Sequence, residues 1–153
     1  MRVLTVRQPW AEAIIFGGKN VENRPRNIAG DYRGPVAIHT GLYKPKPEEW
    51  RSFERDHPDA MARMMNTVPW AQEEFGVIIG VVDLVHVHTA DDAEQTKNLR
   101  GLWPTCSPWA ERSGWHLALI NPRPLAQPIP FKGALGLRKL DDDMIARITE
   151  AIV

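Results

Sequence analysis

The sequence predicts an α+β fold, a small and mostly antiparallel β-barrel of about five or six strands with peripheral helices. Two observations support this. The expected strands do not alternate regularly with helices, as they would in a parallel βαβ sheet. The strongest strand pattern, over residues 75–88, contains Gly80, where a strand can bend or bulge and curl a sheet. A chain of 153 residues suits one domain with a core of its own, so residues 1–153 are expected to form a single domain.

The first elements are a strand, a short helix and an extended segment. We expect the strand over Arg2–Val6 and a helix that starts at Pro9, because proline suits the first helical position. One glycine of the pair 17–18 is expected to end that helix in the left-handed conformation. Residues 20–24 should then be extended, because Pro25 disfavours a helix before it.

The middle of the chain is expected to hold a turn, two strands and a broken helix. Residues 27–34 have turn composition and lead into a strand over 35–40. Residues 45–66 have an amphipathic helical pattern, which Pro58 should divide into two pieces. The strand over 75–88 follows. The two helical pieces expected over residues 45–66 carry both acidic and basic residues and are not predominantly basic.

The last part of the chain begins with a loop-rich region over 90–114. Two strands are expected, over 115–120 and 134–140, separated by the proline-punctuated segment NPRPLAQPIPFKG. A closing helix over 141–153 begins with aspartates, which favour a helix N-terminus. Its apolar stripe consists of Met144, Ile145, Ile148 and Ile152.

The composition is that of an ordinary soluble globular protein, and no apolar run is long enough to cross a bilayer. The N-terminus lacks the apolar stretch of a secretory signal. Cys106 is the single cysteine, so an internal disulfide is excluded. These features favour a reduced, cytoplasmic setting.

The formal net charge is zero, but the charges are unevenly distributed. Residues 1–47 hold eight lysines and arginines against three acidic residues, and residues 121–140 hold four basic residues and no acidic one. If the two segments share a face, they form a positive patch. The alternative is that each segment lies among acidic residues.

Three ionisable residues, Lys19, Glu22 and Arg24, follow the glycine pair within six positions. They form either a surface ion-pair cluster or the polar floor of a pocket. A carboxylate can accept a hydrogen bond from an exocyclic amine of a base, while arginine and lysine can meet base acceptors or phosphate. Strand alternation places Glu22 and Arg24 on one face.

The motifs in order resemble the activating-signal-cointegrator homology (ASCH) domain, a branch of the PUA-like superfamily. RGPVAIHTG at 33–41, GVIIGVVDLV at 76–85 and the segment 115–140 are similar to its later strands. The N-terminal match consists of Gln8, Pro9, Trp10, Ala11, Gly17, Gly18, Lys19, Val21, Glu22 and Arg24. The branch most similar is that of the transcription coactivator that names the family, together with its free-standing prokaryotic counterparts.

This resemblance implies a PUA-like barrel with a cleft beside the first helix, lined by the Lys–Glu–Arg motif. It also implies binding of nucleic acid, RNA first and DNA as the alternative, with no cofactor. A distant branch hydrolyses N4-acylated cytidines with a lysine, a threonine and a glutamate. Lys19 matches that lysine, whereas Glu22 stands in place of the threonine. The alternative function is therefore a small amidohydrolase on modified nucleosides, with Lys19 and Glu22 as catalytic residues. A third is a protein-interaction module that uses the 45–66 helices.

Further residues are candidates for nucleic-acid contacts. Trp10 could form one wall of the cleft or pack under its helix, and His39 could reach the cleft edge or be a structural histidine. Trp103 and Trp109 lie in the loop region and suit either stacking platforms or packed lids. Phosphate contacts are expected from basic residues in both segments. The candidates for this role are Arg7, Arg26, Arg33, Arg123, Lys132, Arg138 and Lys139.

Metal binding receives little support from spacing. His86 and His88 would share one face of a strand, a spacing that two metal ligands can use. No third ligand stands at a persuasive spacing, although Asp83 and Asp91 are near. Cys106 is interpreted as an ordinary loop thiol, since the sequence identifies no partner base for it.

Overall fold

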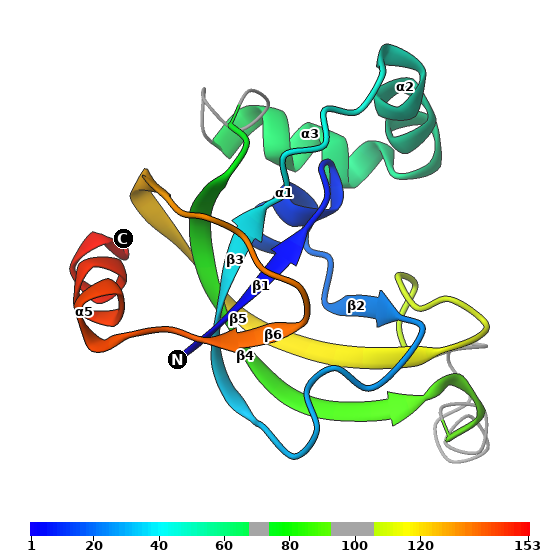
Figure 1. Cartoon of the computed structure of the whole chain (residues 1–153). Coiled ribbons are helices and arrows are strands. Elements are labelled where there is room, and N and C mark those ends of the chain that lie inside the picture. Colours follow the sequence, from blue (N-terminus) through cyan, green and yellow to red (C-terminus); the bar gives the residue numbers. More distant parts are fainter. Residues whose placement is uncertain (68–73, 93–105) are drawn as a thin grey trace.

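A computed structural model describes residues 1–67, 74–92 and 106–153. Its strands form one six-stranded sheet in the order β2-β5-β4-β3-β1-β6 (Figure 1). The strands are β1 (Arg2–Val6), β2 (Val21–Arg24), β3 (Gly34–Thr40), β4 (Val77–Thr89), β5 (Trp115–Pro130) and β6 (Leu137–Lys139). The helices are α1 (Trp10–Ile15), α2 (Pro47–Asp56), α3 (Pro58–Thr67) and α5 (Asp142–Ala151).

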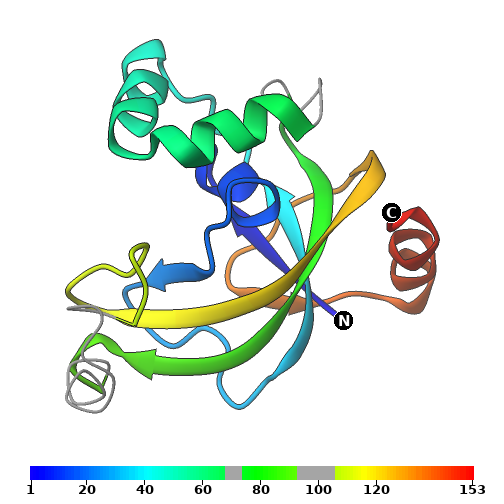
Figure 2. The ribbon, with the colours of Figure 1, turned by 180° about the vertical axis from the view of Figure 1, so that it is seen from behind.

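The sheet is mostly antiparallel, because β1 and β3 are its one parallel pair among the described strands. It curls into a half-barrel, and the long strands β4 and β5 bend together around the molecule (Figures 1 and 2). The expected α+β class, with six strands and peripheral helices in a small PUA-like barrel, is confirmed.

Each face of the sheet packs against different helices. Leu4 and Ile38 face the larger apolar cluster with α1, α2 and α3, while their neighbours Val3 and Ala37 face the smaller cluster with α5. This follows from the two-residue period of a strand. Figure 2 shows α1, α2 and α3 gathered on one side and α5 on the other. The buried apolar residues of β1 and β3 therefore serve two cores at once.

Gly80 marks an irregularity in β4, as the sequence predicts. The pairing register shifts around Gly80 relative to both β3 and β5. Ile79 and Val82 lie in the larger core on either side of it, whereas Ile78 and Val81 lie in the smaller one. A Cβ at Gly80 would lie 2.7 Å from Cδ1 of Ile15 and 2.8 Å from the Arg123 carbonyl oxygen. The bare backbone thus permits both the bulge and the close approach of α1.

The prediction for the late strands was wrong in its boundaries. β5 continues from Trp115 through the proline-rich segment to Pro130, and β6 covers only Leu137–Lys139 of the expected 134–140 strand. β2 pairs with β5 only over Trp115–Ala118, so beyond that point the recorded ladder of β5 is with β4. Proline removes one donor, which an edge tolerates.

The helices begin and end near the glycine, proline and aspartate residues that the sequence predicts. Gly18, with φ of +82°, is the left-handed residue after α1, and His57 separates α2 from α3, which begins at Pro58. The side chain of Asp141 accepts a hydrogen bond from the Met144 backbone N–H at 2.8 Å and so caps α5. Within the described residues, no helix is long and apolar enough to cross a membrane.

Candidate functional site

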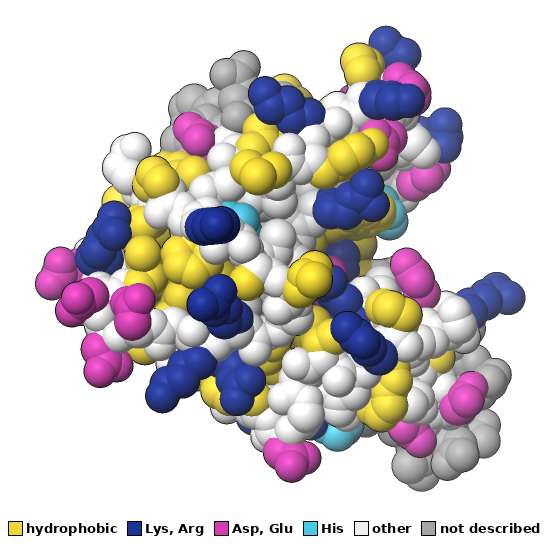
Figure 3. Space-filling view, in the orientation of Figure 1, with side chains coloured by type: hydrophobic (Ala, Val, Ile, Leu, Met, Phe, Trp, Pro, Cys, Tyr) yellow, Lys and Arg dark blue, Asp and Glu magenta, His cyan; other side chains and the backbone are white. Residues whose placement is uncertain are grey.

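A cleft of about 450 Å³ lies beside α1, next to β2 and the segment that precedes β5. Figure 3 shows the molecule hollowed on this side, between the α2–α3 pair and the end of the sheet that carries β2. Its lining is half polar and half aromatic or apolar. The lining residues are Thr5, Val6, Arg7, Trp10, Lys19, Glu22, Asn23, Arg24, Pro25, His57, Pro108, Trp109, Ala110 and Glu111.

The cleft floor is an ion-paired triad formed by Lys19, Glu22 and Arg24. Oε2 of Glu22 lies 3.3 Å from Nζ of Lys19, and Oε1 lies 3.0 Å from Nη2 of Arg24. Their side chains are 3%, 10% and 25% exposed for Lys19, Glu22 and Arg24 respectively. Of the two alternatives left by spacing, the pocket floor is therefore what the structure contains.

Local backbone geometry puts these side chains together. The turn after α1 is fixed by the Lys19 N–H, which donates to the Ala13 carbonyl at 2.9 Å. The Lys19 ammonium donates hydrogen bonds to the Val21 carbonyl and to the Glu22 carboxylate. Glu22 and Arg24 are two residues apart on β2, so they share a face. Nη2 of Arg24 also donates to the Thr5 carbonyl at 2.9 Å, which ties β2 to the end of β1.

Burial controls the electrostatics of Lys19. Desolvation lowers the pKa of this lysine below its ordinary value, and the charge of Glu22 acts against that shift. Glu111, which lines the cleft, also acts to raise the lysine pKa, and Arg24 acts to lower it. The ammonium therefore depends on carboxylates of the cleft for its charge.

One wall of the cleft is aromatic. Trp10, exposed on α1, makes edge contacts with Phe53, His57 and Trp109 at centroid distances of 5.1, 5.6 and 6.5 Å. His57 stacks on Trp109 at 4.4 Å. Nζ of Lys19 lies 6.0 Å from the Trp10 ring. Trp10 thus lies at the cleft, as one of its two predicted alternatives had it, and Trp109 lines the cleft as well. Both rings are held by neighbouring rings.

His57, Asn23 and Glu111 are among the cleft residues that were not predicted from the sequence. His57 ends α2 and reaches the cleft only because the α2–α3 pair packs over α1. Asn23 holds the segment that carries Trp109 and Glu111: its Nδ2 donates to the Trp109 carbonyl at 2.8 Å, and its Oδ1 accepts from the Glu111 N–H at 3.0 Å. None of the three has a local pattern that indicates this role; Asn23, inside the VENR segment, was the nearest to a signal.

His39 does not lie at the edge of this cleft. It is 1% exposed, with Nδ1 3.1 Å from the Thr5 hydroxyl and Nε2 2.9 Å from the Phe131 carbonyl. It borders a neighbouring hollow of about 860 Å³, which also includes Lys132 and shares Thr5 and Arg24 with the cleft. Burial lowers the pKa of His39 and favours the neutral ring. The structure gives it the geometry of a structural histidine.

Some of the basic residues of the two basic segments lie close together, and others do not. Arg24 and Lys132, from the two basic segments, border the same hollow, and Arg2 lies opposite Lys139 across the β1–β6 pair. Figure 3 shows Lys and Arg side chains spread over this face. Arg123 instead forms a bidentate ion pair with Asp83, at 2.7 and 2.9 Å. Arg26 and Arg138 are exposed and outside the cleft lining, and Trp103 lies outside the described residues.

A sequence model described as the ASCH domain matches residues 4–123, which is most of the chain. The chain belongs to the ASCH family. Its fold is also similar to solved structures of an ASCH protein from Zymomonas mobilis. The first has 12% identity and a TM-score of 0.54, covering 99% of this chain and 95% of that one. A point variant of that protein has 15% identity and a TM-score of 0.55, covering 99% and 98%. At this identity the likeness concerns the ASCH fold alone.

Proposed function

We propose that this ASCH domain, as a single unit over residues 1–153, binds RNA and seats one nucleotide or unstacked base in the cleft. The observation that carries the proposal is an aromatic wall facing an ion-paired floor across a hollow of about 450 Å³. Clefts of this size and composition suit small planar ligands. Tryptophan rings provide stacking surfaces for bases in single strands. DNA is the alternative ligand.

The polar groups of the floor supply hydrogen bonds to a nucleotide. Glu22 can accept from an exocyclic amine, and Arg24 and Arg7 can donate to base acceptors or phosphate. The buried Nε of Arg24 has no hydrogen-bond partner among the described residues, so a donor remains available there. Outside the cleft, Lys132, Arg26 and Arg138 would contact the phosphate backbone of the nucleic acid. These contacts add affinity but no base specificity.

The proposal is tested by titrating the protein with labelled single-stranded RNA, duplex RNA and duplex DNA at low salt and then over a salt series. We expect single-stranded RNA to bind with an affinity that falls as salt rises. Arg24→Ala should weaken binding about tenfold or more, since hydrogen bonds to charged groups contribute ~1.5–3 kcal/mol. Trp109→Ala should act similarly through lost stacking.

The matched control is Arg147→Ala, an exposed arginine on α5, which packs on the other face of the sheet. It should leave the affinity unchanged. Absence of binding to all three nucleic acids at low salt would contradict the proposal. Binding that neither cleft variant changes would place the contact surface outside the cleft.

A second function, an amidohydrolase on modified nucleosides, is favoured by one observation. Burial lowers the pKa of Lys19, which increases the fraction of neutral amine that a base or nucleophile needs. Glu22 would then orient the substrate amide. Incubation with N4-acetylcytidine followed by chromatography tests it: turnover that Lys19→Ala abolishes supports an enzyme, and no turnover at high protein concentration excludes it. In either case we place the protein in the cytoplasm, where Cys106 would stay reduced.

A further inference from the structure

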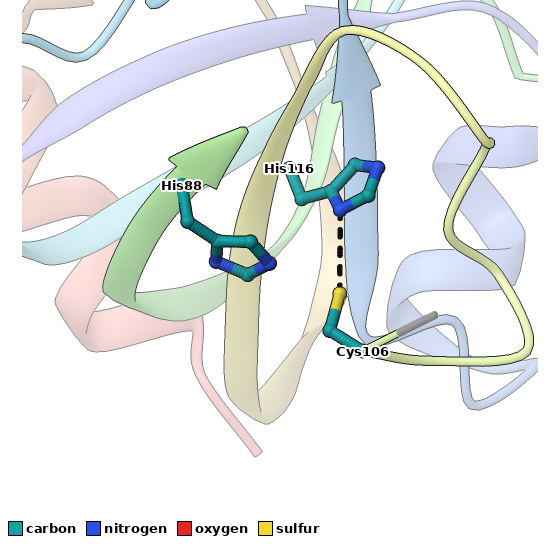
Figure 4. A group of neighbouring side chains, drawn as sticks. All are labelled: His88, Cys106 and His116. Atoms are coloured by element: carbon teal, nitrogen blue, oxygen red, sulfur yellow. Dashed lines mark hydrogen bonds between the residues drawn. The ribbon is translucent and has the colours of Figure 1, made fainter. Parts of the chain in front are cut away.

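A cluster outside the cleft gathers three metal-ligating side chains, His88, Cys106 and His116. One potential ligand atom from each lies within 4.8 Å of the others. They come from the end of β4, the segment before β5 and the start of β5. Figure 4 shows the two imidazole rings and the thiol turned toward one another. This combination does not arise from the His86–His88 spacing, because His86 is exposed and outside the cluster.

The hydrogen bonds of His116 prepare it as a ligand. Nε2 of this buried ring lies 2.8 Å from the Glu111 carbonyl oxygen, which can only accept, so Nε2 carries the proton. Nδ1 then presents a lone pair, and it lies 3.4 Å from Sγ of Cys106. Metal-bound histidines commonly donate their second N–H to a backbone carbonyl in this way.

His88 provides the second observation. Both of its ring nitrogens are buried, and neither has a hydrogen-bond partner among the described residues. An unsatisfied buried polar group is costly, which makes a ring with two of them unusual. Its ring centroid lies 5.2 Å from that of His116, in a perpendicular arrangement. A cation between the rings would satisfy one nitrogen of each.

From this geometry we propose that His88, Cys106 and His116 bind one Zn²⁺ ion, with a fourth position open to water. Zinc takes imidazole and thiolate ligands at ~2.0–2.3 Å in a tetrahedron, whose S···N edge is then about 3.5 Å. The observed 3.4 Å between Cys106 and His116 matches this edge. His88 has to approach by no more than about 1.5 Å. On binding, the thiol proton passes to solvent. The Zn²⁺ ion with two neutral imidazoles and one thiolate then has a net charge of +1.

The ion would also brace the cleft. Between Cys106 and His116 the chain carries Trp109 and Glu111, which line the cleft. The carbonyl that orients His116 is that of Glu111. Binding of zinc would therefore fix both ends of this segment. The zinc site does not rest on the proposed RNA function, because it follows from the cluster alone.

The test is zinc stoichiometry and affinity by competition with a chromophoric chelator, on metal-free protein kept reduced. We expect one Zn²⁺ per chain, and thiolate-to-metal charge-transfer absorption when Co²⁺ replaces zinc. Cys106→Ser and His88→Gln should each weaken zinc binding at least about 100-fold, beyond the 10–100-fold typical of outer-shell partners. Cys106 is exposed and His88 is half-buried, so these variants leave the fully buried His116 unchanged.

The matched control is His86→Gln, which removes an exposed histidine from the same face of β4 and should keep zinc binding. Zinc should also protect Cys106 from alkylation. No stoichiometric binding, or equal loss in the His86→Gln variant, would overturn the site. So would rapid alkylation of Cys106 that zinc does not slow, which indicates a cysteine–histidine nucleophile pair instead. RNA affinity is measured separately, so failure of either proposal is distinguishable.

Discussion

The cleft floor and the His88–Cys106–His116 cluster are two groups of polar side chains that differ in how far their hydrogen-bonding atoms are paired within the protein. In the cleft floor, each oxygen of Glu22 faces a cation, and Lys19 has two acceptors. In the cluster, His88 has two buried nitrogens without a partner among the described residues. In the first group the charged groups pair with one another, and Nε of Arg24 is the one buried side-chain atom of the triad without a partner among the described residues. In the second group, a bound cation would satisfy one nitrogen of His88. Removing one partner of a self-paired buried site leaves an uncompensated charge, whereas an unpaired buried polar group is a cost that a ligand removes.

The largest test of this comparison removes the acceptor at the centre of the cleft floor. Glu22→Gln should lower the free energy of unfolding by about 4 kcal/mol, because it leaves the buried Lys19 charge without its carboxylate. Urea denaturation near neutral pH measures the loss. Burial holds the lysine pKa low in the folded state, so a charged Lys19 is destabilising below that pKa. The loss should therefore shrink as pH rises toward 10.5 and be smallest above it, where lysine is neutral in both states.

Glu54→Gln, an exposed glutamate of α2, is the matched control and should change stability by less than about 0.5 kcal/mol. If the Glu22 variant unfolds like the control at every pH, the cleft floor is not a buried, self-paired site.

Glu12 lies between the two extremes and gives the second test. This fully buried carboxyl accepts one hydrogen bond, at 2.6 Å from Gln8, and its other oxygen has no partner among the described residues. Burial raises the Glu12 pKa from 4.5 to about 8. The folded state therefore holds this proton more tightly, and stability falls as pH rises between these values. Glu12→Gln should be more stable than the native protein by about 3 kcal/mol at pH 7.

This gain should disappear below pH 4.5, where the native carboxyl is protonated in both states. Thermal unfolding across the pH range gives both values. A constant difference between the two proteins would show that Glu12 does not titrate with folding.

The smallest expected effect concerns the cluster without metal. His88→Leu, measured with a chelator present, should raise the free energy of unfolding by about 1 kcal/mol, because it removes two unsatisfied nitrogens. His116→Leu should instead lower it by a similar amount, since that ring donates to the Glu111 carbonyl. Chemical denaturation of the three proteins provides the comparison. If both changes destabilise equally, the nitrogens of His88 are satisfied in solution.

Local pattern was sufficient wherever the cause is local. The break at Pro58, the left-handed residue after α1 and the bulge at Gly80 each follow from the chemistry of one or two residues. The same holds for Glu22 and Arg24, whose spacing on a strand fixes their shared side. The error over β5 has a tertiary cause. Prolines read as a break in a strand, yet here they fall where β2 no longer pairs with it.

The sequence alone determined the barrel class, the ASCH motifs and the charged residues of the cleft floor. These features depend on strand and helix periodicity and on short spacings, which act over a few residues. Tertiary structure decided the rest. It turned His39 away to a neighbouring hollow, brought His57 and Glu111 to the cleft, and joined positions 88, 106 and 116. Contacts between residues far apart in the chain depend on how the sheet curls and how its segments pack, and no local spacing encodes them.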